Sequence, residues 1–142
     1  MINGKAWDLT VSESEVRRTE IHELHSNQEE TDTRVILYVK YAQTKGFQST
    51  IVRSPDTDIF FILLHHCNDL DITIYGDIGK GRQRRVINIT ELGRSLGRQW
   101  CEILLALYVF TGEDCTGAFP GKGKIKPLQK LEKHPKFHSA FR

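Results

Sequence analysis

The stretch of residues 49–64 reads STIVRSPDTDIFFILL and predicts the first unit of the fold. Its β-branched run from Ser49 to Val52 predicts a short strand, which ends before the Ser54-Pro55 pair. The continuous apolar run from Ile59 to Leu64 predicts a buried helix after the turn. A strand, a turn and a helix in this order form the first part of an α/β unit.

Further elements alternate on both sides of this unit. A capping box at Ser26 and Glu29 precedes apolar residues at helical spacing from Val35 to Ala42, which predicts a helix that stops at Gly46. Two strands then flank the glycine-rich GDIGKGRQRR and three helices follow: Ile72–Tyr75 and Val86–Ile89, then Thr90–Leu96, Trp100–Phe110 and Leu128–Lys133. We therefore expect an α/β three-layer sandwich with a mainly parallel central sheet. An extended lead-in, residues 1–25, would precede one domain with a basic C-terminal tail, residues 26–142.

Length and composition indicate one compact core. The chain has 142 residues, of which 39% are hydrophobic. Its three cysteines are an odd number that argues against a disulfide framework, and Cys67 and Cys101 lie in apolar stretches where we expect burial. No apolar run reaches the ~18 residues of a membrane span, and the first residues lack the order of a signal peptide. We therefore expect an intracellular protein, nuclear or cytoplasmic, without a membrane partner.

Charge divides the chain into blocks. The formal net charge of +2 combines −6 over residues 1–79, +5 over 80–98, −3 over 99–116 and +6 over 117–142. Lys and Arg neutralise phosphates, and bound cations neutralise clustered carboxylates, so the functional interpretation is a polyanion that runs from basic to acidic blocks. A solvated charged surface is the simpler alternative.

Five carboxylates lie in three short motifs: Glu30 and Asp32 in EETDTR, Asp56 and Asp58 in SPDTDIFF, and Asp114 in TGED. Each motif lies at an expected helix or strand end, where a packed core can bring distant side chains together. Mg²⁺ and Mn²⁺ prefer such oxygen ligands, and a bound ion removes the repulsion between neighbouring anions. Each motif also has a structural explanation, as a helix cap, a first-turn acid or a turn.

In their order and spacing these motifs resemble the flap endonuclease and XPG-like 5′-nucleases, a superfamily with the PIN-like fold. Glu30-x-Asp32 resembles their Glu-Ala-Glu-Ala element, Asp56-x-Asp58 their Asp-x-Asp element, and Gly112-Glu113-Asp114 their Gly-Cys/Ser-Asp element. The GKGK segment that follows resembles the glycine turn of their helix-hairpin. The motifs are closer still to a set of uncharacterised animal proteins that carry EADTR, SPDTDV, TGCD and SAFKGKGK. The resemblance covers roughly residues 26–130.

The resemblance implies a divalent-metal-dependent nuclease with Asp56 and Asp58 as catalytic residues. Mg²⁺ or Mn²⁺ would be held by Glu30, Asp32, Asp56, Asp58 and Asp114, and nucleic acid would meet Arg82, Arg84, Arg85, Lys122, Lys124 and Lys126. Three features depart from the family pattern. A further metal-binding Asp has no counterpart before residue 26, Glu113 replaces Cys or Ser, and Lys122 replaces an apolar residue. We therefore expect a domain truncated at its N-terminus and incomplete or inactive as a nuclease.

Two other classes of function stay open. A catalytically inert nucleic-acid-binding or interaction module of the same fold would keep the basic segments without the full metal site. A nucleotide-sugar or phosphate-ester enzyme would use the Asp-x-Asp motif alone to hold a metal on a diphosphate. The nuclease interpretation predicts that all five carboxylates converge at the carboxyl ends of parallel strands. If Asp114 lay on the opposite side of the sheet from Asp56, that interpretation would be excluded.

Overall fold

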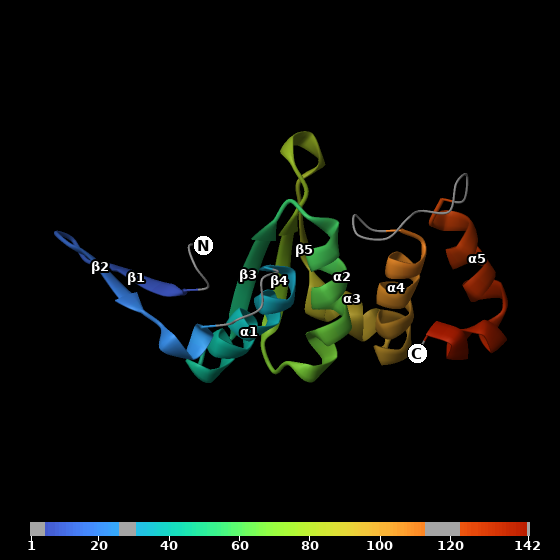
Figure 1. Cartoon of the computed structure of the whole chain (residues 1–142), viewed down its shortest axis with the longest axis horizontal. Coiled ribbons are helices and arrows are strands. Elements are labelled where there is room, and N and C mark those ends of the chain that lie inside the picture. The colour runs from blue at the N-terminus through green and yellow to red at the C-terminus, as the bar shows by residue number, and fades with distance from the viewer. Residues whose placement is uncertain (1–4, 26–30, 113–122, 142) are drawn as a thin grey trace.

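The structure is a computed structural model that describes residues 5–25, 31–112 and 123–141, with the backbone alone for 31–33 (Figure 1). Its strands are β1 (Trp7–Val11), β2 (Val16–Glu20), β3 (Ser49–Ser54), β4 (Thr73–Ile78) and β5 (Arg85–Asn88). Its helices are α1 (Thr31–Thr44), α2 (Thr57–His66), α3 (Ile89–Leu96), α4 (Arg98–Phe110) and α5 (Ile125–Lys133). Short 3₁₀ segments cover His22–Leu24 (η1), Cys67–Asp69 (η2), Gly81–Gln83 (η3) and Pro135–Phe141 (η4). The described chain is therefore α/β, and none of its helices is long and apolar enough to cross a membrane.

The central sheet has the strand order β3-β4-β5 and is mixed. β3 pairs with β4 in parallel, with Arg53 opposite Asp77, whereas β5 pairs with β4 in the antiparallel direction. We expected a mainly parallel sheet, but these three strands form a mixed one. A parallel connection needs a crossover of about a dozen residues or more, and only residues 79–84 join β4 to β5. The short glycine-containing link closes a hairpin instead.

Helices α1, α2 and α3 all pack against one face of this sheet. One buried cluster joins Val39 of α1, Leu63 of α2, Ile74 of β4 and Ile89 at the start of α3. Burial alternates along β3, and Ile51 points away from this cluster with 68% of its surface exposed. Within the described ranges no helix packs on that second face, so these elements form two layers where we expected three.

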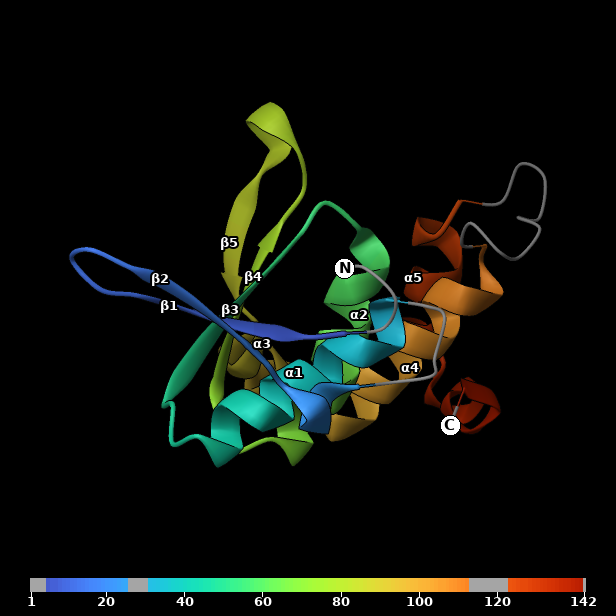
Figure 2. The ribbon, with the colours of Figure 1, turned by 60° about the vertical axis from the view of Figure 1, so that its left-hand side comes forward.

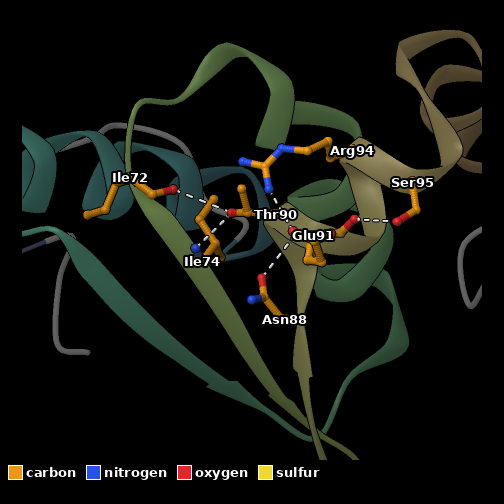
Figure 3. A network of polar contacts seen from close by, with 7 residues as sticks. All are labelled: Ile72, Ile74, Asn88, Thr90, Glu91, Arg94 and Ser95. Carbon is orange, nitrogen blue, oxygen red and sulfur yellow. Dashed lines mark hydrogen bonds and ion pairs between the residues drawn. The ribbon is translucent and has the colours of Figure 1, made fainter.

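Hydrogen bonds made by side chains at the start of α3 hold this helix against the beginning of β4 and the residue before it (Figure 3). The Thr90 hydroxyl accepts a hydrogen bond from the Ile74 amide at 2.9 Å and donates one to the Ile72 carbonyl at 3.4 Å. Asn88 caps α3, because its side-chain oxygen accepts from the Glu91 amide at 3.0 Å. The two bonds of Thr90 take over from β5, which ends at Asn88, along the edge of β4. Together with the cap they set the direction in which α3 leaves the sheet.

Two parts of the molecule extend from this body of helices and sheet (Figure 2). Residues 1–25, expected as an extended lead-in, contain the antiparallel hairpin of β1 and β2, which we call the arm. The β4–β5 hairpin projects beyond the sheet with η3 at its tip. On the other side, α4 and α5 share a small second core of Ile103, Leu107 and Leu131.

The two cysteines that the structure describes are buried, as their apolar sequence context predicts. Cys67 and Cys101 are free thiols with 3% and 1% of their surfaces exposed. Burial raises the pKa of the Cys67 thiol to about 11, so this thiol is protonated at neutral pH. Cys115 lies outside the described residues.

Candidate functional site

Asp56 lies where β3 ends and α2 begins. It is the N-cap residue of α2 and has an extended backbone, but its side chain makes no capping hydrogen bond to this helix. Its backbone amide donates instead to the Ser54 hydroxyl at 3.1 Å. The exposed carboxylate borders a shallow pocket that Tyr38 and Arg53 also line. An N-cap Asp that does not cap its helix keeps both carboxylate oxygens for another ligand.

Asp58 lies one residue into α2 and turns toward a different element. Its carboxylate accepts a hydrogen bond of 2.5 Å from the Tyr108 hydroxyl of α4. The Tyr108 ring stacks on Phe61 at 4.3 Å between centroids, and the Lys124 ammonium lies 3.7 Å from its centroid. An extended backbone would place Asp56 and Asp58 on one face, but α2 starts at Thr57 and separates them.

Asp77 is an acidic residue of this region that sequence reasoning missed. Its side chain is 6% exposed on β4 and accepts two hydrogen bonds from Arg84, at 2.7 and 2.6 Å. The Arg53 guanidinium is 3.7 Å away. These hydrogen bonds from Arg84 hold the pKa of Asp77 below its ordinary value. The available signal was an acid near the carboxyl end of an apolar strand, two residues before Gly79.

The three remaining carboxylates of the predicted metal site are described in part or not at all. Glu30 and Asp114 lie outside the described residues, and Asp32 is placed in the first turn of α1 by its backbone alone. Convergence of all five carboxylates therefore stays a prediction. Among the side chains that are described, neither Asp56 nor Asp58 belongs to a group of three His, Cys, Asp or Glu ligands close enough to share an ion.

The predicted basic contacts fall into two classes. Arg82 at the tip of the β4–β5 hairpin, Arg85 at the start of β5 and Lys126 in α5 are exposed. Arg84 is paired with Asp77, and the Lys124 ammonium donates to the Gly112 carbonyl at 2.5 Å. Lys122 lies outside the described residues. Arg82, Arg85 and Lys126 are the better candidates for a phosphate, because Arg84 and Lys124 would first have to leave their partners.

A separate cluster at the root of the arm could hold a metal ion. One ligand atom each from Glu20, His22 and His25 lies within 4.8 Å of the other two, and it is the one such cluster found in the described part of the chain. The sequence analysis did not predict this cluster. The signal was the spacing E-x-H-x-x-H in EIHELH, residues 20–25.

Comparisons of this chain with protein-family models, with curated proteins and with solved structures find no match. The candidate sites therefore depend on the geometry of the chain itself. Two of them are distinct in chemistry: an oxygen-ligand edge at Asp56 and a histidine-containing cluster at Glu20.

Proposed function

We propose that the protein binds the phosphodiester backbone of a nucleic acid at the carboxyl edge of β3 and β4, with Asp56 holding Mg²⁺ or Mn²⁺ against a phosphate. The observation that carries this proposal is the Asp56 carboxylate, exposed at the end of a parallel strand and not used to cap α2. The first turn of α2 supplies backbone amides and the positive end of the helix dipole, which favour an anion. A metal ion and a helix N-terminus together suit a phosphate.

Positive charge near this edge supports the same proposal. The Arg53 side chain is 73% exposed, lines the pocket at Asp56 and lies 3.7 Å from the carboxylate of Asp77. The β4–β5 hairpin carries the exposed Arg82 and Arg85 away from the edge, in the chain block of net charge +5. A nucleic-acid backbone that follows the hairpin would reach Asp56 with its phosphates already partly neutralised.

Hydrolysis of the bound backbone, as in the PIN-like nucleases, is the fuller form of this proposal. It needs two ions about 4 Å apart that activate a water and stabilise the leaving oxygen. Glu30, Asp32 and Asp114 would have to join Asp56 and Asp58 as ligands. The alternative is a module that binds without cleavage. Two contacts favour it, because Tyr108 already satisfies Asp58 and Arg84 already satisfies Asp77 without any ion.

Nucleic-acid binding is tested by fluorescence anisotropy with labelled single-stranded and duplex DNA and RNA in Mg²⁺. We expect log K to fall linearly with log salt concentration. Arg82→Glu should weaken binding several-fold, while Arg17→Glu, an equal charge change on the exposed β2 strand, should have a much smaller effect. Equal losses in the two variants would mean that only net charge matters, and the hairpin would then have no special part in binding.

The metal and the chemistry are tested together with Mn²⁺ titrations of flap, hairpin and single-stranded substrates. We expect saturable Mn²⁺ binding that Asp56→Asn removes, with no cleavage by either protein. Cleavage by the original chain that disappears in Asp56→Asn would favour the nuclease form over the binding module. Cleavage that persists unchanged in Asp56→Asn would identify a contaminating nuclease.

A further inference from the structure

The 3₁₀ geometry of η1 brings two imidazoles to one side of the arm's root. A 3₁₀ helix has three residues per turn, so side chains three positions apart eclipse each other. His22 opens η1 and His25 is its C-cap, and their ring centroids are 4.9 Å apart. Glu20, the last residue of β2, lies beside them, with its Oε1 3.0 Å from Nε2 of His25.

The Glu20 carboxylate is in an unusual state for a residue at the end of an exposed strand. Its Oε1 has no solvent-accessible surface and no hydrogen bond of good geometry, although two nitrogen atoms crowd it. One is Nε2 of His25 and the other is Nζ of Lys5, also at 3.0 Å. A glutamate carboxylate is ionised at neutral pH, so Glu20 offers an anionic ligand.

We propose that Glu20, His22 and His25 form a binding site for a divalent transition-metal ion of the Zn²⁺ type, in which the ion takes the place of the Lys5 ammonium. Ligands around tetrahedral Zn²⁺ lie ~2.0–2.1 Å from the metal, and therefore about 3.3 Å from one another. The three ligand atoms already lie within 4.8 Å of one another, which is close to this spacing. Three protein ligands leave the fourth position to a water molecule.

The ligand set decides which ion fits. Two imidazoles and one carboxylate suit Zn²⁺, Co²⁺, Ni²⁺ or Cu²⁺, whereas Mg²⁺ and Mn²⁺ favour sites made of oxygen ligands. The site is therefore separate in chemistry from Asp56 as well as in position. It does not depend on the proposed nucleic-acid binding, and either one can fail while the other holds.

An ion at this position would stiffen the root of the arm. The Ile21 amide donates to the Ala6 carbonyl at 2.9 Å, which closes the hairpin beside Glu20. Leu24, inside η1, is 3% exposed, and its carbonyl accepts a hydrogen bond of 3.3 Å from Arg34 of α1. The ion would link β2 to η1 across these contacts, and so fix the direction of the arm relative to α1.

Calorimetric titration of the full chain with Zn²⁺ tests this proposal, with the absorption of bound Co²⁺ as a second readout. We expect one site with a dissociation constant on the order of micromolar or tighter and the visible bands of tetrahedral Co²⁺. His22→Ala with His25→Ala should weaken binding by at least roughly tenfold. Lys5→Met should strengthen it, because the competing ammonium is removed.

Control variants separate this site from others. His134→Ala removes an exposed histidine of the C-terminal segment and should leave Zn²⁺ affinity unchanged, as should Asp56→Asn. Circular dichroism checks that each variant is folded. The absence of saturable Zn²⁺ binding would overturn the proposal, and so would an unchanged affinity in the folded double histidine variant. In either case the three side chains with Lys5 would be an ion-pair cluster only.

Discussion

Leu63 in α2 and Leu9 in β1 are the same side chain in opposite surroundings: Leu63 is fully buried, and Leu9 is 62% exposed. The difference extends to their elements. α2 packs against α1, α3, α4 and β4, whereas every residue of β1 is exposed. The body of helices and sheet is therefore held by burial of apolar surface. The arm is held by its strand ladder and by polar contacts at its root, such as Lys5 with Glu20.

This contrast separates stability from function. Apolar burial in the body fixes the backbone around Asp56. The position of Asp56 therefore depends on residues that do not contact a ligand. The arm contributes little apolar burial, and its exposed Val11 and Val16 are 74% and 65% accessible. Low local stability is expected where few apolar contacts and many exposed backbone hydrogen bonds occur. Matched substitutions in the body and in the arm measure how far the stabilities of the two regions differ.

The largest effect is expected for Leu63→Ala. Deletion of a fully buried leucine side chain costs about 2–5 kcal/mol of unfolding free energy, because apolar transfer energy is lost and a cavity remains. The matched change Leu9→Ala on the arm should cost less than about 0.5 kcal/mol. Urea unfolding measures both. Similar losses in the two variants would show that the arm shares the stability of the body.

Gly93→Ala in α3 should come next. Alanine in a helix is favoured over glycine by about 1 kcal/mol, but a Cβ at this position would lie 2.1 Å from the Cys67 Sγ. Overpacking of this kind costs about 1–3 kcal/mol, so we expect net destabilisation in urea unfolding. Gly123→Ala, where a Cβ would meet nothing within 4 Å, is the control. If the clash is the cause, combining Gly93→Ala with Cys67→Ala should cost less than the two single changes added together.

Asp77→Asn should have a smaller effect that depends on pH. Arg84 lowers the pKa of Asp77 in the folded protein, so the folded state binds this proton more weakly than the unfolded state. The resulting stabilisation is present above the unfolded pKa of an Asp and is lost as pH falls through the lower folded pKa. Urea unfolding should show the variant less stable than the original chain at neutral pH, with the difference shrinking in acid. The control is Asp71→Asn, which changes an exposed aspartate. If both variants showed the same pH dependence of stability, the effect could not be assigned to the Asp77–Arg84 pair.

The smallest effect belongs to the arm. The Arg18 guanidinium lies 3.8 Å from the centroid of the Trp7 ring, a contact worth about 0.5–1 kcal/mol at exposed sites. Arg18→Gln should speed hydrogen exchange of amides in β1 and β2 and leave the amide of Ile74 in the body unchanged. Arg18→Lys, which keeps a cation, should have a weaker effect. Faster exchange at Ile74 would mean that the arm and body unfold together.

Local patterns in the sequence located most elements. The apolar spacing from Val35 to Ala42 and the run from Ile59 to Leu64 become α1 and α2, because helix periodicity is set by neighbours along the chain. The direction of β5 could have been predicted from the short link before it. The face of the sheet that no described helix covers could not be predicted, because β3 carries the exposed apolar Ile51, which the sequence alone cannot tell from a buried residue.

The candidate site was predicted less completely. The position of Asp56 at a strand end followed from Pro55 and the apolar run after it. The partners Tyr108 for Asp58 and Arg84 for Asp77 could not be predicted, since they depend on how α4 and the β4–β5 hairpin pack. The histidine cluster at the arm's root depends on a 3₁₀ turn. The E-x-H-x-x-H spacing is visible in the sequence, but only three residues per turn place His22 and His25 on one side.

Anomalous diffraction from a crystal soaked in Mn²⁺ shows whether Asp56 is the metal-binding carboxylate at the sheet edge. We predict an ion within ligand distance of the Asp56 carboxylate, and no ion there in crystals of Asp56→Asn. A second ion nearby would indicate that Glu30, Asp32 or Asp114 completes a two-metal site. Crystals with ordered Mn²⁺ elsewhere and none at Asp56 would show that Asp56 is not the metal-binding carboxylate.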